Sequence, residues 1–238
     1  SDGRTARAGL DHLWEVKYRD WQDVRILSTQ QIIDLLKKKR YVNRLSMRLI
    51  SGDIGSDVQL PIDPWLMGFL LGDGCLTAVP PRFSTPDAEI VDRVASEIPN
   101  GYKLTRSGKY DYHIVRESRA GTGRENIFAT MLDGAGVMGK YSYQKRIPPV
   151  YLTASKRQRL ELLRGLMDSD GWVESFNAMR FATSSFGLAK DVQQLVWSLG
   201  GLCSISVKAT TSLDSFVLNI RHSDGQQFVW LQRKAVRI

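Results

Sequence analysis

The feature that most constrains this 238-residue chain is an apolar helix signature that occurs twice, each time ending in Asp-Gly. The first copy covers residues 64–74 and the second covers residues 156–171. Asp63 can cap the first helix, and Ser155 can cap the second with capping-box spacing to Gln158. An internal repeat of this kind predicts a duplicated structural unit.

The segments that follow the two helix signatures also match each other. Both copies are followed by a short strand, a second helix, a strand pair and a last short helix. The expected short strands are 82–85 and 180–184, the second helices 86–98 and 188–199, the strand pairs 102–105 with 110–115 and 202–207 with 216–220, and the last helices 125–132 and 226–233. The prediction is an α+β domain with a pseudo-two-fold αββαββα repeat, with repeat one near 61–140 and repeat two near 141–238.

Both signature helices carry small residues four positions apart, a spacing that places them on one helix face. The small residues are Gly68 and Gly72 in the first helix and Gly165 and Ser169 in the second. Small residues let two helix backbones approach closely, so the two helices are predicted to pack together at the centre of the domain.

Each small-residue face is followed directly by an aspartate, Asp73 or Asp170. Packing would bring both carboxylates to the same end of the helix pair, where they repel each other and oppose the helix dipole. A divalent cation removes both costs, and Mg²⁺ accepts carboxylate and phosphate oxygens together. The matched positions predict a metal site, with simple Asp-Gly turns as the alternative. An EF-hand calcium loop beginning at Asp168 is excluded, because Gly171 comes too early.

Residues 163–171, Leu-Arg-Gly-Leu-Met-Asp-Ser-Asp-Gly, resemble the nine-residue LAGLIDADG motif, and residues 66–74 are a looser match. Two copies in one chain resemble the monomeric, two-motif homing endonucleases of this family, in the branch encoded within inteins. The resemblance implies that the eighth motif position, here Asp73 and Asp170, binds Mg²⁺, which Mn²⁺ or Ca²⁺ can replace in a crystal. Asp168, at the sixth position, would be accessory or structural. The implied activity is site-specific cleavage of both DNA strands, leaving short 3′ overhangs.

The resemblance also implies a catalytic lysine and a DNA-binding surface. Residues 145–148, Lys-Arg-Ile-Pro, resemble the block before the second motif of intein endonucleases. Lys145 is therefore a catalytic candidate or, alternatively, an ordinary loop residue. In the family the strands form a saddle on duplex DNA, so the basic strand residues are DNA-binding candidates. They are Arg82, Lys103, Arg106, Lys109 and Arg116 in the first repeat and Arg180, Lys208 and Arg221 in the second.

Two other functions are compatible with the same motifs. One is a non-cleaving LAGLIDADG nucleic-acid-binding protein, such as a maturase or a transcription factor. The other is a fragment of a protein-splicing intein. The presence of both motif aspartates and of Lys145 favours the nuclease. A hydrolase of another class is not indicated, since the chain has three histidines and no nucleophile-elbow motif.

Residues 1–60 are predicted to be a remnant of an intein splicing (Hint-like) domain, ending in a linker rich in Gly, Ser and Asp at 51–57, before an endonuclease domain at 61–238. Residues 9–13 resemble a splicing-domain block, in which His12 would be a relic or, alternatively, a structural histidine. An intein needs a Cys or Ser nucleophile within an N-terminal splicing block and His-Asn at its end. We therefore do not expect this chain to splice.

The charge of the chain favours a polyanionic partner. The chain has 33 Lys and Arg against 25 Asp and Glu, a formal net charge of +8 and a pI near 9.6, which makes nucleic acid the first candidate. Four consecutive cations, Lys37, Lys38, Lys39 and Arg40, either contact phosphates or form the solvated end of a short helix. The sequence contains no membrane-length apolar run, no charged-then-apolar leader and too few cysteines for a disulfide scaffold. We expect an intracellular, DNA-associated monomer, in the cytoplasm or nucleoid, with duplex DNA and no membrane as its partner.

Overall fold

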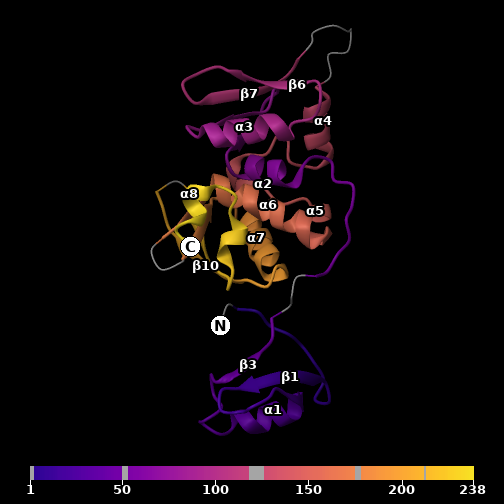
Figure 1. The fold of residues 1–238 in the computed structure, drawn as a ribbon, viewed down its shortest axis with the longest axis vertical. Helices are drawn as coiled ribbons and strands as arrows, with labels where there is room; N and C mark the ends of the chain where they lie inside the picture. The colour runs from indigo at the N-terminus through magenta and orange to yellow at the C-terminus, as the bar shows by residue number, and fades with distance from the viewer. Residues whose placement is uncertain (1–2, 50–52, 118–125, 175–177, 212) are drawn as a thin grey trace. The chain divides into compact units, whose positions relative to one another are not determined.

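The computed structural model describes residues 3–49, 53–117, 126–174, 178–211 and 213–238. It divides the chain into two compact units, residues 1–50 and 51–238. Figure 1 shows the elements of both units, coloured from indigo at the N-terminus to yellow at the C-terminus. None of the described helices is long and apolar enough to cross a membrane.

The first unit is a small antiparallel sheet with one helix. Its strands β1 (Leu13–Tyr18), β2 (Arg25–Ser28) and β3 (Leu45–Met47) are arranged in the order β2-β1-β3, and helix α1 (Thr29–Leu36) follows β2 directly. Ser28 caps α1 by accepting a hydrogen bond from Gln31 N, as the sequence predicts. The buried apolar side chains of this unit are Val16, Tyr18 and Tyr41.

The second unit contains two repeats with the predicted element order. The first repeat consists of α2 (Pro64–Gly72), β4 (Gly74–Cys75), β5 (Arg82–Ser84), α3 (Ala88–Glu97), β6 (Tyr102–Arg106), β7 (Asp111–Arg116) and α4 (Ile127–Gly134). The second consists of α6 (Lys156–Ser169), β8 (Gly171–Val173), β9 (Met179–Thr183), α7 (Phe186–Ser198), β10 (Leu202–Lys208), β11 (Ser215–Arg221), the 3₁₀ helix η2 (Gly225–Phe228) and α8 (Gln232–Ala235). Between them lie η1 (Ser142–Gln144) and α5 (Pro149–Thr153). The predicted α+β class and αββαββα order are confirmed.

Each repeat forms its own antiparallel sheet, and the two sheets have the same topology. The strand orders are β4-β5-β7-β6 and β8-β9-β11-β10. Gly74 pairs with Phe83 in the first sheet, and Gly171 pairs with Phe181 in the second, so both buried phenylalanines occupy equivalent positions. Helices α2 and α6 lie side by side between the repeats, with α3 and β7 on one side and α7 and β10 on the other (Figure 1).

Helices α2 and α6 are in contact through their backbones. A Cβ atom placed on Gly68 would overlap Leu162 O and lie 2.9 Å from Leu166 N. A Cβ on Gly165 would overlap Trp65 O and lie 2.7 Å from Phe69 N. The glycines are therefore required by the close approach of the helices. Every residue of α2 from Trp65 to Leu71 is buried, which explains why this helix is apolar on all sides.

The end of the second repeat differs from the sequence prediction. A helix was expected over 226–233, but the structure has η2, an extended stretch at 229–231 and the one-turn helix α8. The carboxylate of Asp168 accepts hydrogen bonds from Trp230 N and Leu231 N, both at 3.1 Å. These backbone donors are paired with a side chain rather than with helix carbonyls, so the helix cannot continue through them.

Residues 53–58 belong to the second unit, whose first residue lies before the predicted boundary at residue 60. The buried side chain of Arg159 donates to Ile54 O at 2.8 Å. Gln158 accepts from Val58 N at 3.2 Å and donates to Val58 O at 2.7 Å. Composition predicts a linker here. It cannot reveal the packing, because the partners of this backbone lie on α6, about a hundred residues later.

Gly68→Ala and Gly165→Ala should each destabilise the second unit, because the added methyl group meets a backbone carbonyl that cannot rotate away. We expect a loss of about 1–3 kcal/mol in the free energy of unfolding, as for other overpacked interiors. Urea denaturation would measure it. Gly134→Ala is the matched control, since nothing lies within 4 Å of a Cβ there. Equal stability of all three variants would contradict the backbone contact.

Candidate active site

The two motif aspartates end the two central helices. Asp73 is the C-cap of α2 and donates its N–H to Phe69 O at 3.0 Å, and Asp170 is the C-cap of α6 and donates to Leu166 O at 3.1 Å. In both repeats the next residue, Gly74 or Gly171, begins a strand. A Cβ on either glycine would overlap the last turn of the helix, so the Asp-Gly pair is what allows this abrupt change of direction.

The packing of α2 on α6 brings the two carboxyl groups to the same end of the helix pair. A Cβ placed on Gly72 would overlap the Ser169 hydroxyl and lie 3.3 Å from Asp170 Oδ2. Burial, followed by the charge of Asp170, raises the pKa of Asp73 to about 6. Burial also raises the pKa of Asp170, although the charges of Lys145 and Lys234 oppose this shift. Asp170 is half-buried and Asp73 is exposed to solvent, so the two carboxyl groups repel each other at the solvent edge of the helix ends.

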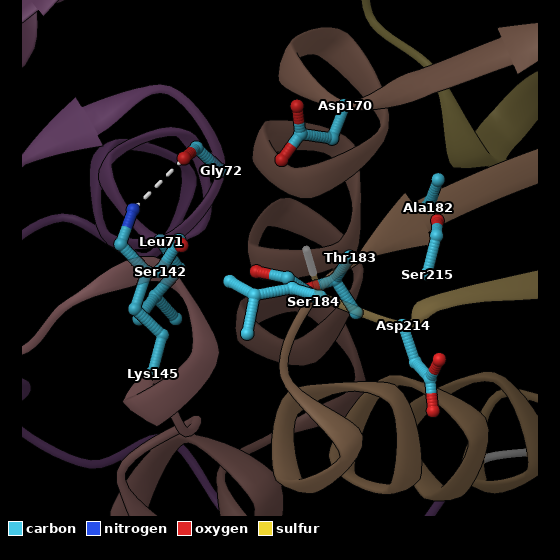
Figure 2. A pocket seen from close by; sticks show the side chains of 11 residues that line it. Leu71, Gly72, Ser142, Lys145, Asp170, Ala182, Thr183, Ser184, Asp214 and Ser215 are labelled. Carbon is cyan, nitrogen blue, oxygen red and sulfur yellow. Dashed lines mark hydrogen bonds between the residues drawn. The ribbon is translucent and has the colours of Figure 1, made fainter. Parts of the chain in front are cut away.

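Lys145 caps the C-terminus of α2. Its ammonium group donates to Leu70 O at 3.2 Å, Gly72 O at 2.9 Å and Gly74 O at 2.8 Å, and the residue is only 5% exposed. Figure 2 shows its contact with Gly72 beside Asp170. All three N–H groups of the ammonium are used in these contacts. Lys145 thus neutralises the negative end of the helix and fixes the backbone on both sides of Asp73.

A second lysine, Lys234, caps α6 in the same way and was missed in the sequence analysis. Its ammonium group donates to Met167 O at 2.7 Å, Asp168 O at 2.8 Å and Gly171 O at 2.7 Å. Burial lowers its pKa to about 8. The internal repeat could have predicted Lys234, since a lysine that caps the helix of the first copy implies an equivalent lysine for the helix of the second. Lys145, which caps α2, closes repeat one in the structure, whereas the sequence assigned it to repeat two.

Asp168, the sixth motif residue, has a structural place. Its Oδ2 atom accepts from Trp65 Nε1 at 2.9 Å, while Oδ1 accepts from the backbone of residues 230 and 231. All these donors are neutral, and the Trp65 donor lies on α2, the helix that ends at Asp73. Asp168 thus joins α2, α6 and the segment that leads to Lys234.

A cavity of about 280 Å³ opens beside Asp170. It is lined by Lys145, Ser142, Thr183 and Ser184 among others, as Figure 2 shows. Its walls come from η1, from the end of β9 and from the turn between β10 and β11. Polar groups from both repeats therefore converge on one side of the carboxylate pair.

The donor atoms at the helix ends fit a hard divalent cation. Asp73 and Asp170 offer carboxylate oxygens, the ligands that Mg²⁺ prefers. Among the described residues, no group of three or more His, Cys, Asp or Glu side chains is placed to hold a metal ion. A pair of carboxylates suits Mg²⁺, which takes one or two carboxylates and fills its remaining positions with water and phosphate oxygens.

The predicted DNA-binding residues lie on different faces of the sheets. Arg82 pairs with Cys75 and His113, and Arg180 pairs with Trp172 and Asn219 in the equivalent register. These rows lie on the sheet faces opposite the buried phenylalanines. Arg180 is also bound by Glu174 at 3.1 Å. The side chain of Lys103 shares the face of Arg82, and those of Lys208 and Arg221 share the face of Arg180.

The other predicted DNA contacts lie apart from these rows. Arg106 and Arg116 pair with Tyr112 and Tyr102, on the face that carries the core, and Arg106 closes the hairpin by donating to Gly108 O at 3.0 Å. Lys109 lies in that hairpin turn, over the ring of Tyr110. The cations at 37–40 and His12 belong to the first unit, where the cations are exposed and the His12 ring contacts Trp14.

Comparison with known proteins identifies the motif-bearing segment. Residues 157–227 match the LAGLIDADG-like domain family. This chain carries a LAGLIDADG-like domain. The resemblance predicted from the motifs is thereby confirmed, and the matched residues contain the second motif from its helix to the last strand of its sheet.

Several proteins with different names are similar to this chain over part of their length. The chain is 31% identical over 183 residues to a replicative DNA helicase DnaB of Mycobacterium intracellulare, covering 76% of this chain and 27% of that protein. It is 32% identical over 143 residues to an iron-sulfur cluster assembly SufBD family protein of Mycobacterium leprae, covering 57% of this chain and 15% of that protein. It is 29% identical over 160 residues to protein RecA of Mycobacterium tuberculosis, covering 61% and 20%. The chain spans about a quarter or less of each relative.

Solved structures of the homing endonuclease I-DmoI are also similar to this chain. A structure of its mesophilic variants is 16% identical, with a TM-score of 0.48 over 71% of this chain and 92% of that one. I-DmoI in complex with DNA and Mn is 14% identical, with a TM-score of 0.48 over 71% of this chain and 93% of that one. I-DmoI in complex with DNA and Ca is 15% identical, with a TM-score of 0.46 over 71% and 86%.

Asp73→Asn should stabilise the metal-free protein at alkaline pH. The carboxyl pKa rises from 3.8 to about 6 on folding, so the folded state binds more protons between these values and loses stability as pH rises through them. Because the Asp73 side chain is exposed and solvent screens its charge, removing that charge should add at most about 1 kcal/mol to the free energy of unfolding at pH 8. Urea denaturation in EDTA would measure it. At pH 4 the variant should match the wild type, and an equal gain at both pH values would contradict the charge explanation.

Proposed function

We propose that this chain is a site-specific, metal-dependent double-strand DNA endonuclease of the LAGLIDADG type. The observation that supports it most strongly is the symmetric pair of helix ends, each with an aspartate at its C-cap and a buried lysine across its carbonyls. Duplex DNA offers two antiparallel strands related by a local two-fold axis. A pseudo-symmetric site of two carboxylates suits the cleavage of both.

Asp73 and Asp170 would hold the metal, and the lysines would support it. Bound Mg²⁺ neutralises the carboxylates and stabilises the attacking and leaving oxygens of a phosphodiester hydrolysis. Lys145 and Lys234 keep the two helix ends in place and contribute positive charge where the phosphate backbone must approach. Since the donors of both ammonium groups are already occupied, their contribution is electrostatic and positional rather than a direct hydrogen bond to DNA.

The outer faces of the two sheets would bind the DNA on either side of the metal site. The row that contains Arg82 begins at Cys75, two residues after Asp73. The row that contains Arg180 begins at Trp172, two residues after Asp170. Two-stranded ribbons fit the major groove, where arginine reads guanine and asparagine reads adenine. Arg82, Lys103, Lys208 and Arg221 would serve as phosphate or base contacts, and cleavage would leave short 3′ overhangs.

The relatives support an inserted element as the origin of the segment. The relatives carry three different names, replicative DNA helicase DnaB, iron-sulfur cluster assembly SufBD family protein and protein RecA, yet each matches this chain over only part of its own length. A mobile segment inserted in several host proteins would give this pattern. We therefore propose that this chain is the endonuclease region of an intein, with residues 1–50 as part of its splicing domain and His12 as a splicing-block relic. We also propose that the protein is an intracellular, DNA-associated monomer.

Asp73→Asn and Asp170→Asn should each abolish double-strand cleavage and leave DNA binding largely unchanged. Asparagine keeps the shape of the side chain but loses the charge that holds the metal. The probe would be a duplex selected by the wild type from a random pool in EDTA and then incubated with and without Mg²⁺. Wild-type turnover of either variant would exclude these residues as metal ligands, and binding without any cleavage by the wild type would favour the non-cleaving LAGLIDADG protein.

Neutralising Lys37, Lys38, Lys39 and Arg40 should weaken binding to specific and random duplexes alike. Each lost phosphate contact should lower the slope of log K against log salt by about 0.9. Titrations of labelled duplex at several salt concentrations would measure the slope. The cleavage rate of the saturated complex should be unchanged, because the carboxylates lie in the other unit. An unaltered slope would show that this cluster does not contact DNA.

A further inference from the structure

The two capping lysines are held in place by two separate hydrogen-bond networks. The sequence motifs predict neither network, and the residues of both networks are distinct from Asp73 and Asp170. Each network fixes the backbone that carries one lysine. These networks matter because the position of a lysine ammonium group depends on the position of the main chain that carries it.

Helix α7 of the second repeat anchors Lys145. Ser185, the N-cap of α7, is 1% exposed and donates its hydroxyl to Lys145 O at 2.7 Å. Asp191, six residues after Ser185 on α7 and 4% exposed, accepts from Ile147 N at 3.0 Å. It also binds Arg146 through two bonds of 2.7 Å. Three consecutive residues, 145–147, are thus attached to one helix.

A different set of contacts anchors Lys234. Asp168, which is 4% exposed, accepts from the backbone N–H groups of Trp230 and Leu231, and Lys234 N donates to Leu231 O at 2.9 Å. Arg233 is paired with Asp87, the N-cap of α3 in the first repeat. The lysine of each repeat is therefore tied to the other repeat, through α7 for Lys145 and through α3 for Lys234.

We propose that Ser185 and Asp191 are positioning residues for Lys145, that Asp168 is a positioning residue for Lys234, and that each network governs the cutting of one DNA strand. This inference rests on the proposed endonuclease function. Its basis is the geometry of the networks, which share no residue.

The two lysines act on different sides of the site. Lys145 lines the cavity beside Asp170, together with Ser142 and Thr183 (Figure 2), whereas Lys234 is not among the residues that line it. A duplex whose two scissile phosphates lie on either side of the carboxylate pair would meet one lysine with each strand. Loosening one lysine should therefore impair one cut and leave the protein able to make the other.

The experiment follows each strand separately. A duplex selected by the wild type from a random pool in EDTA is labelled with a different fluorophore on each strand, and cleavage is started with Mg²⁺ under single-turnover conditions. Ser185→Ala and Asp191→Asn should slow the same strand, and Asp168→Asn should slow the other, by about 10- to 100-fold, the usual cost of a slightly misplaced catalytic group. The unaffected strand should be cut at nearly the wild-type rate, so nicked duplex accumulates.

Two further variants separate positioning from general stability. Ser155→Ala is the matched control, because Ser155 caps α6 as Ser185 caps α7 but contacts neither lysine segment. It should leave both rates nearly unchanged. Ser185→Thr keeps the hydroxyl and should restore the rate lost in Ser185→Ala.

The outcomes distinguish the two proposals. Strand-selective loss with rescue by threonine supports separate positioning networks. Equal slowing of both strands in every variant, or loss of activity that follows a fall in melting temperature, overturns them while leaving the endonuclease function intact. A wild type that binds the selected duplex and cuts neither strand overturns the endonuclease function, and the positioning roles fall with it.

Discussion

The backbone contact between α2 and α6 is the constraint on which the rest of the second unit depends. Gly68 and Gly165 let the helices approach so closely that neither can carry a side chain at these positions. Because the helices meet at equivalent positions, their ends also meet, and the residues after their last turns are brought together from distant parts of the sequence. The two sheets then extend in equivalent topologies from the two helix ends. One packing contact thus sets both the symmetry of the unit and the place of its charged groups.

The same contact creates an electrostatic problem that the lysines resolve. Two helix C-termini and two carboxylates gather negative charge in one place, and desolvation together with the charge of Asp170 raises the pKa of Asp73 to about 6. Lys145 and Lys234 each bind three carbonyl oxygens at one helix end, so the backbone charge is balanced without using the carboxylates. The carboxylates keep their oxygens available for a cation. Under the proposed function, the charge that the lysines leave unbalanced on the two carboxylates would attract a divalent metal.

Much of the fold was predictable because local signals agreed with the repeat. The caps Asp63 and Ser155 begin their helices as predicted, and the strand pairs lie where alternation placed them. The errors concern tertiary partners. Lys234 lacks a motif of its own, the expected helix near it is interrupted by hydrogen bonds to Asp168, and the packing of residues 53–58 depends on α6. The strand register adds that Arg106 and Arg116 share a face with the core. Sequence periodicity carries no information about the partners of Asp168, Lys234 and residues 53–58, since those partners lie more than 60 residues away along the chain.

The symmetry of the backbone does not extend to the side chains that would face DNA. The row beside Asp73 contains Cys75, Arg82, His113 and Thr105, whereas the equivalent row beside Asp170 contains Trp172, Arg180, Asn219 and Ser204. The arginines match in register, but Arg180 forms an ion pair with Glu174, whereas Arg82 lies beside Cys75 on the neighbouring strand. Base readout depends on the donors and acceptors of individual side chains. Under the proposed function, two unlike rows on a symmetric frame would read two unlike half-sites, so duplication of the repeat gives a single chain access to DNA targets that are not palindromic.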